Sequence, residues 1–461
     1  MAKTTRAPES PRARPPAIGR LLTSGRVVPL LTLHGHQRVV VALRQAREQE
    51  PQAGPDWDER IAERARSLLG PGRRLVPVIN GTGVVVHTNL GRAPIAAAAA
   101  RRAAELAMGY TNLELDLESG GRGDRQDLLQ DLLRDLTGAE AAVVVNNGAA
   151  ALLLALTALC SGREVVVSRG EAVEIGGGFR IPEVLRLSRA KLVDVGTTNR
   201  TRLQDYQAAC NPKTAAFLRV HPSNFRIEGF TQTVPRARLA ELAHRQGVLL
   251  LEDLGSGLLG PVTAATPGED PLRQSLAQGA DLAFASGDKL VGASQAGLAV
   301  GRANQVARMR RHPLFRALRP DKLQLAALEE TLLCHATPGR LAEVPVWQML
   351  RVPLAELRRR CQAWAERLAA LGVAAEVVPL RGAVGGGASP GRELSSWGLR
   401  IGHPGRRRVR QALLGADPPV LVLERAGAVV LDARTVLPGQ DAELLGSLAS
   451  VLAPAAGGRP S

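Results

Sequence analysis

Short apolar runs alternate with longer amphipathic stretches through the middle of the chain, between about residues 75 and 330. Ala141–Val145 and Val248–Leu251 are continuous apolar runs, the pattern of strands buried on both faces of a parallel sheet. The stretches between such runs have the composition of helices, as in the alanine- and leucine-rich segment that ends at Cys160. This alternation predicts a large α/β domain, which we place over residues 71–335.

The N-terminal part of the chain has a helical pattern. Residues 38–47 are amphipathic, a break follows at Pro51–Pro55, and residues 56–69 are helical again. We therefore expect a small, basic helical domain over residues 18–70. Residues 1–17 hold four prolines and several arginines, which predicts a disordered basic tail.

The C-terminal part mixes helical and strand patterns. A helix over residues 321–334 leads out of the large domain, and one long helix is expected over residues 344–371. Gly382–Gly391 is predicted to be a glycine-rich loop. Together with short strands, these elements predict an α+β domain over residues 336–455. The strands are expected near residues 373–379, 396–401, 420–424 and 428–432.

A turn of small polar residues follows the first of the apolar runs. Asn146, Asn147 and Gly148 separate the predicted strand from the next helix, and Ala149 lies in its first turn. The backbone N–H groups of Asn147, Gly148 and Ala149 would be open to an anion, and the helix dipole would favour negative charge there. An ordinary strand–turn–helix packing unit has the same pattern, so this feature alone does not establish a phosphate site.

Two carboxylates end the second apolar run. Glu252 and Asp253 come directly after Val248–Leu251, and ligands of open α/β sheets bind at the carboxyl ends of the strands. The carboxylate of Asp253 could bind the nitrogen of a pyridine ring and keep that nitrogen protonated. A helix N-cap or a loop aspartate is an equally good interpretation of Asp253 taken alone.

Lys289 is one of only five lysines among 59 basic residues, so composition does not explain why a lysine stands there. A Schiff base requires an amine, because a guanidinium stays protonated and is not a nucleophile. Ser286 precedes the lysine by three positions and could bind a phosphate. A surface lysine in a glycine-rich turn is the simpler interpretation of this segment by itself.

Taken together, the three features match what pyridoxal phosphate (PLP) requires of a protein: a phosphate cradle, an acid opposite the ring nitrogen, and a lysine amine. They occur in the chain order of the aminotransferase-like fold of PLP enzymes (fold type I). Asp253 precedes Lys289 by 36 positions, with a helix and a strand between them. The sequence therefore predicts a PLP enzyme of this fold.

The charge of the chain points to a second partner. Its formal net charge of +16 predicts an anionic partner, for which RNA is the leading candidate. Aromatic residues make up only 3% of the chain, which favours a folded RNA held by its phosphates over stacked single-stranded bases. The alternative is a compositional bias towards arginine on a solvated surface.

Composition also narrows the class of protein. No apolar run has the length of a membrane span, and the N-terminus lacks the apolar region of a signal peptide. The four cysteines are scattered and form neither a disulfide framework nor a metal motif, and the eight histidines show no ligand spacing. We expect a soluble cytoplasmic protein without a metal site.

Several motifs, found in one order between about residues 18 and 453, resemble those of the bacterial selenocysteine synthase family, the L-seryl-tRNA(Sec) selenium transferases. Two positions depart from the family pattern. Asn146 and Asn147 are followed by Gly148 where a third asparagine is expected, and Ala293–Ser294 stands where Gly-Pro is usual. The matching motifs are Asn80–Pro94, Tyr110–Glu114, Gly120–Gly123, Ser168–Pro182, Val195–Asn199, His221–Phe230, Ser286–Gln295, Arg316–Lys322, Val384–Gly387 and Leu431–Pro438.

The resemblance implies a reaction and roles for individual residues. The enzyme would convert L-seryl-tRNA(Sec) to L-selenocysteinyl-tRNA(Sec) with selenophosphate, by PLP-dependent β-elimination to an aminoacrylyl intermediate followed by selenium addition. Lys289 would hold PLP and move protons once released. Asp288 would orient Lys289 or assist the departing hydroxyl.

The resemblance also implies an anion site and an assembly. Arg92, Arg316 and Arg319 match the arginines that bind selenophosphate in this family, and Arg316 and Arg319 would share one face of a helix. Members of the family form homo-oligomeric rings of dimers, with a decamer as the expected size. Their active sites lie between subunits.

Two alternatives remain open on the sequence. A PLP-dependent lyase or desulfurase of the same fold would act on a free amino acid and would not need the basic domain at residues 18–70. A nucleic-acid-binding protein with a vestigial site would be expected to lack Lys289, Asp253 or the phosphate cradle. Because all of these features are present, the sequence favours the tRNA-dependent enzyme.

Overall fold

The chain divides into two compact units, Met1–Pro77 and Val78–Ser461. A computed structural model describes residues 17–49, 56–70, 75–175, 178–222, 224–389, 391–402, 406–425 and 428–453. Apart from Ala17, the basic tail expected over residues 1–17 lies outside these described residues. Among them, no helix is long and apolar enough to cross a membrane.

The first unit is helical, as its sequence pattern indicated. Its core is formed by fully buried apolar side chains that include Leu21, Leu43 and Ile61, and Trp57 is almost fully buried beside them. The helices are α1 (Ile18–Leu22), α2 (Val28–His34), α3 (His36–Gln49) and α4 (Trp57–Leu69).

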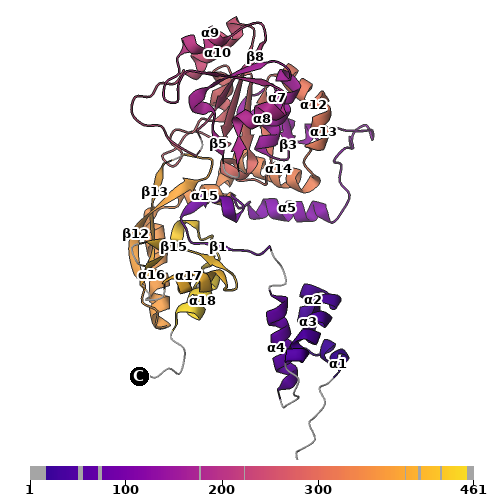
Figure 1. The fold of residues 1–461 in the computed structure, drawn as a ribbon, viewed down its shortest axis with the longest axis vertical. Coiled ribbons are helices and arrows are strands. Elements are labelled where there is room, and N and C mark those ends of the chain that lie inside the picture. Colours follow the sequence, from indigo (N-terminus) through magenta and orange to yellow (C-terminus); the bar gives the residue numbers. More distant parts are fainter. Residues whose placement is uncertain are drawn as a thin grey trace, which may run out of the picture. The chain divides into compact units, whose positions relative to one another are not determined.

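A seven-stranded sheet forms the centre of the second unit (Figure 1). Its strand order is β3-β11-β10-β9-β8-β4-β7, and every neighbouring pair is parallel except the two pairs made by β11. The strands are β3 (Ala141–Val145), β4 (Glu164–Ser168), β7 (Lys191–Val195), β8 (Thr214–Val220), β9 (Leu249–Gly255), β10 (Leu282–Ser286) and β11 (Gly297–Gly301).

Helices cover both faces of this sheet, because alternate residues of each strand point to opposite sides. On β3, Val143 packs with α7 and α12, whereas Val144 packs with α6 and α14. The bounds of the helices that surround the sheet are α5 (Ala97–Ala107), α6 (Asp127–Thr137), α7 (Gly148–Cys160), α8 (Ile181–Leu187), α9 (Leu203–Ala209), α10 (Arg236–Arg245), α11 (Leu272–Ala277), α12 (Ala303–Arg311), α13 (Pro313–Ala317) and α14 (Lys322–Ala336). A short hairpin, β5 (Glu174–Ile175) and β6 (Phe179–Arg180), precedes α8.

A second sheet of five strands, in the order β15-β16-β13-β12-β2, carries the C-terminal region. Its strands are β2 (Val84–Val86), β12 (Glu376–Gly385), β13 (Glu393–Gly402), β15 (Leu423–Arg425) and β16 (Ala428–Asp432), and β1 (Ile79–Asn80) pairs with β14 (Val420–Leu421) beside it. Residues 79–86 therefore pair with C-terminal strands, although we expected them in the large domain. The helices of this region are α15 (Pro345–Arg351), α16 (Leu354–Ala370), α17 (Arg406–Leu414) and α18 (Asp441–Leu452).

Two expectations for the C-terminal region were wrong. The single helix over residues 344–371 is broken into α15 and α16 by Pro353, because the residue before a proline is driven out of the helical conformation. Val352 accordingly has a non-helical ψ of 129°. The glycine-rich loop begins later than Gly382, because β12 continues to Gly385 and pairs there with β2.

Candidate active site

Lys289 lies in a buried turn at the carboxyl end of β10. The chain forms one π-helical turn over Gly287–Val291, and at Lys289 the backbone departs from helical geometry. Only 5% of Lys289 is exposed. A side chain on Gly387, which has a φ of +87°, would overlap the lysine amine, so this glycine closes tightly over Nζ. The structure therefore excludes the interpretation of Lys289 as a surface lysine.

The surroundings of Lys289 favour a neutral amine. Burial lowers the pKa of Lys289, and the nearby charge of Arg92 lowers it further, against the opposing effects of Asp253, Asp288 and Glu269. An amine must be unprotonated to attack a carbonyl carbon. A neutral amine at this position could attach covalently to an aldehyde.

Asp253 lies near Lys289 on the neighbouring strand β9. Its carbonyl oxygen accepts a hydrogen bond from the backbone N–H of His221 at 2.9 Å. Burial raises the pKa of Asp253 to about 6, although Lys289 and His221 both act to lower it. A protonated ring nitrogen beside this carboxylate would supply the further positive charge that keeps it ionised.

The residues of the predicted phosphate cradle lie close together. The Oδ1 of Asn147 caps α7 by accepting from the N–H of Ala150 at 2.8 Å. The N–H groups of Gly148 and Ala149 open the helix, so no carbonyl inside α7 is available to them. A side chain at Gly148 would overlap the hydroxyl of Ser286, which shows that β3 and β10 bring these two positions together. An anion at this point would meet backbone N–H groups and a hydroxyl.

These features fit PLP. The lysine amine follows β10, the buried carboxylate lies on β9 and the candidate anion cradle follows β3, all at the carboxyl edge where the sequence placed them. Lys289 could hold the aldehyde carbon, Asp253 the ring nitrogen, and Ser286 with the start of α7 the phosphate.

Asp288 forms an ion pair with Arg92. Its two carboxylate oxygens accept from Nη1 of Arg92 at 2.9 and 3.1 Å, and the backbone N–H of Ala93 donates to its carbonyl oxygen at 3.2 Å. The side chain of Asp288 is only 8% exposed. In this structure Arg92 thus belongs to the lysine site, with its charge held by Asp288.

Arg316 and Arg319 lie at a different cavity from the Lys289 site. Both line a cavity of about 500 Å³, whose other charged walls include Glu114 and Arg122, and Lys289 is not among its lining residues. Nη1 of Arg319 lies 2.9 Å from Oε1 of Glu114. The expectation that the two arginines share a helical face was wrong, because α13 ends at Ala317.

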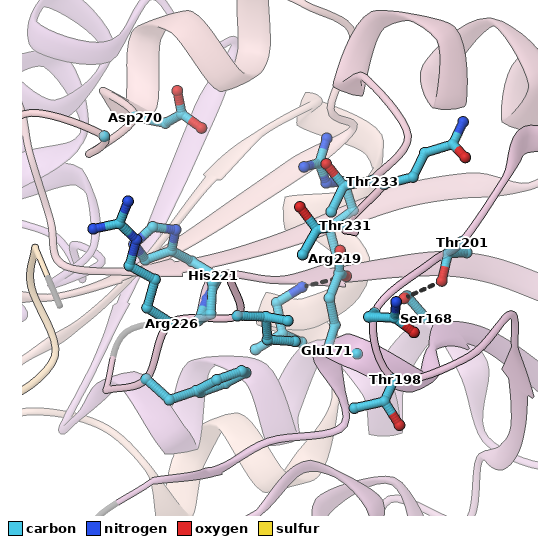
Figure 2. Close-up of a pocket in the computed structure, with 18 of the residues that line it drawn as sticks. Ser168, Glu171, Thr198, Thr201, Arg219, His221, Arg226, Thr231, Thr233 and Asp270 are labelled. Atoms are coloured by element: carbon cyan, nitrogen blue, oxygen red, sulfur yellow. Dashed lines mark hydrogen bonds between the residues drawn. The ribbon is translucent and has the colours of Figure 1, made fainter. Parts of the chain in front are cut away.

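A cavity of about 540 Å³ next to Asp253 contains residues that we did not single out (Figure 2). Glu171 and His221 line it, from the segments that follow β4 and β8. Burial raises the pKa of Glu171 to about 7, and its Oε2 accepts from the N–H of Val220 at 3.1 Å. His221 follows β8 directly and Glu171 comes three residues after β4, so their position at the ends of apolar strands was a signal in the sequence, the same one that identified Asp253.

Comparison with known proteins identifies the family. Residues 78–437 match the family model described as SelA: L-seryl-tRNA selenium transferase. An L-seryl-tRNA(Sec) selenium transferase of Moorella thermoacetica is 45% identical over 460 residues, covering 95% of this chain and 96% of the relative. One from Rhizobium meliloti (strain 1021) is 43% identical over 449 residues, covering 94% and 96%.

A solved structure of D-glucosaminate-6-phosphate ammonia-lyase has a TM-score of 0.58 at 22% sequence identity, covering 82% of this chain and 96% of that one. At this identity the likeness concerns the fold alone. Together with the strand order, it confirms the expected α/β class, the aminotransferase-like fold type I.

Proposed function

We propose that this chain, which belongs to the L-seryl-tRNA selenium transferase family, converts L-seryl-tRNA(Sec) to L-selenocysteinyl-tRNA(Sec) as a PLP-dependent enzyme. The structural observation that carries the proposal is the buried Lys289 amine, enclosed by glycine and located beside Asp253. The family match extends over most of the chain and supplies the substrate. The selenium donor is selenophosphate.

The chemistry requires removal of a proton from Cα, loss of the seryl hydroxyl and addition of selenium at Cβ. PLP, when bound, supplies an electron sink for the negative charge left on Cα. Lys289 removes and returns that proton, because its lowered pKa favours the neutral amine that a base requires. Asp253 keeps the ring nitrogen protonated, and Ser286 with Asn147, Gly148 and Ala149 holds the phosphate.

Asp288 positions Arg92 in this proposal. Because the two oxygens of Asp288 hold one nitrogen of the guanidinium, the remaining N–H groups are directed beside Lys289 and can bind a phosphate oxygen of the donor. The Asp288 carboxylate also remains close enough to affect the Lys289 charge.

Arg316 and Arg319 bind the donor across a subunit interface. They line a separate cavity of their own chain, which supports a role in the site of a partner chain. We propose that the protein assembles as a ring of dimers, a decamer, in which these arginines serve the Lys289 of a neighbouring subunit.

The helical unit that ends at Pro77 is proposed to grip the body of the tRNA. It has its own core, and α3 exposes Arg38, Arg44 and Arg47. Phosphates of a folded RNA are the natural partners for such arginines. The scattered free cysteines favour a reducing cytoplasm as the place of action.

A direct assay tests the proposal. Purified protein with PLP, seryl-tRNA(Sec) and selenophosphate should yield selenocysteinyl-tRNA(Sec), and the Lys289→Ala variant should yield none. Conversion of free serine at the same rate, with no requirement for tRNA, would instead identify a lyase acting on a free amino acid.

A further inference from the structure

Glu269 is a buried carboxylate that joins three parts of the large unit. It lies in the segment between β9 and α11 and is 2% exposed. Its Oε1 accepts the backbone N–H of Ser389 and lies 3.5 Å from Nε2 of His221. Ser389 belongs to the glycine-rich loop whose Gly387 closes over Lys289. Glu269 therefore links this loop to the end of β8.

His221 connects Glu269 to the proposed cofactor site. It follows β8 directly, and its backbone N–H donates to the carbonyl oxygen of Asp253 at 2.9 Å. The 3.5 Å gap to Glu269 is that of an ion pair and exceeds a normal hydrogen bond. The imidazole thus has a fixed carboxylate on one side and lies close enough to Asp253 to influence its charge.

His221 lies among charged groups of both signs. The acidic ones are Glu269, Asp270, Glu252 and, across the cavity of Figure 2, Glu171, whereas Arg219, Arg226 and Arg392 line the same cavity. Burial acts to lower the pKa of His221, but the neighbouring carboxylates outweigh burial and raise it above the ordinary value. His221 therefore keeps its positive charge to a higher pH than an ordinary histidine does.

We infer that Glu269 and His221 are positioning residues that keep Asp253 ionised, and so keep the ring nitrogen of the bound cofactor protonated. This inference rests on the proposed function, because it concerns the same cofactor. It adds a pair of residues that act through Asp253 and need not contact the substrate.

The charges that face Asp253 explain why it needs this support. They are Lys289, His221 and Glu252, and only the first two favour its ionised form. Lys289 must give up its ammonium charge to join the cofactor. His221 is then the protein cation among these groups that still stabilises the carboxylate, and Glu269 holds it in the charged form.

The test is a pH titration of the yellow absorbance of the lysine-bound cofactor, made on full-length protein with PLP alone. Glu269→Gln keeps the size of the side chain and removes its charge. Without the protonated ring nitrogen, the cofactor–lysine linkage should hold its proton more tightly. The midpoint at which the yellow band disappears should rise by about one pH unit, and PLP affinity should fall about tenfold.

Three comparisons make this result specific. His221→Asn should move the midpoint in the same direction, and it serves where Glu269→Gln fails to fold. Asp253→Asn should raise the midpoint by the largest amount. The double variant Asp253→Asn/Glu269→Gln should have the same midpoint as Asp253→Asn alone, because both substitutions act through the Asp253 carboxylate. Glu228→Gln, an exposed carboxylate paired with Arg226 at 3.2 Å, should behave as wild type.

An unchanged midpoint in both Glu269→Gln and His221→Asn would overturn the inference. So would a double variant shifted well beyond Asp253→Asn alone. A wild-type protein that remains colourless with added PLP would overturn the proposed function itself, which separates the two failures.

Discussion

Charged side chains are buried at the carboxyl edge of the large sheet, whereas the ion pairs of the helical unit Met1–Pro77 are exposed. At the sheet edge, Lys289 and Asp288 are more than nine-tenths buried and close to other charges. In the helical unit, Arg20 pairs with Asp58 at 2.9 Å and Arg26 with Glu59 at 2.6 Å, but all four side chains are at least 40% exposed.

This difference in burial shows where the substitution of a single charged residue should have a large effect. Exposed ion pairs contribute about 0.2–1 kcal/mol each, because water and salt screen them. Burial instead shifts the ionisation of a group strongly, as the raised pKa of Asp253 shows, and its charged neighbours Lys289 and His221 then oppose that shift. We expect single substitutions to have large effects at the sheet edge, and substitutions in the helical unit to act only collectively.

The largest effect is expected at Lys289. Lys289→Ala and Lys289→Arg should both lower selenocysteinyl-tRNA formation by more than about a thousandfold, or roughly 4 kcal/mol, because neither side chain can form the covalent linkage. Both should also lose the yellow absorbance while keeping the wild-type circular dichroism spectrum. Lys213→Ala, at an exposed position, is the matched control. Full activity of Lys289→Arg would show that only a positive charge is needed there.

The buried Glu171 should make the stability of the folded protein depend on pH. Its pKa is about 7 in the folded protein against an ordinary value of 4.5, so between these pH values the folded state binds more protons than the unfolded state. Stability should therefore fall as pH rises through this range, by up to roughly 3 kcal/mol. Glu171→Gln can still accept from Val220 and should remove the loss.

Urea unfolding at two pH values measures this effect. Glu171→Gln should match wild type near pH 4 and be more stable near pH 8. A variant that is equally stable at pH 8 would show that Glu171 is better solvated than its burial implies.

The arginines of the 500 Å³ cavity are expected to have a smaller effect. Arg319→Ala should raise the selenophosphate concentration needed for half-maximal rate by tenfold to a hundredfold, the equivalent of about 1.5–3 kcal/mol. Arg92→Ala and Arg316→Ala should act alike, with tRNA affinity nearly unchanged. Arg122→Ala is the control, because Arg122 lines the same cavity but is 78% exposed. A loss of tRNA binding instead would assign these arginines to the RNA surface.

The smallest effect per residue is expected on α3. Replacing Arg38, Arg44 and Arg47 together with Ala should weaken tRNA binding about tenfold and reduce the slope of log affinity against log salt by about two to three. The absorbance of bound PLP should not change. Arg20 and Arg26 already bind carboxylates, so replacing them should matter less. If replacing Arg20 and Arg26 weakened tRNA binding as much as replacing the three arginines of α3, then α3 would not be the specific tRNA contact.

Much of the site could be predicted because its residues lie at the ends of apolar strands or within three residues of them. Asn147, Asp253 and Lys289 each come after such a run, and parallel strands bring their carboxyl ends to one edge. His221 and Glu171 have the same signal, but only their burial among other charges distinguishes them. Glu269 has no such signal, because it lies in an irregular segment and meets His221 only through the fold.

The sequence by itself determined the fold class and the family, and it predicted the lysine, the acid and the turn that we propose for PLP, since these depend on local pattern and residue type. Only the tertiary structure decided that Asp288 holds Arg92, that Arg316 and Arg319 line a separate cavity, and that β1 and β2 pair with C-terminal strands. These are contacts between residues far apart in the chain. Local pattern carries no record of which distant groups meet, and burial shifts the pKa of a group only after they have met.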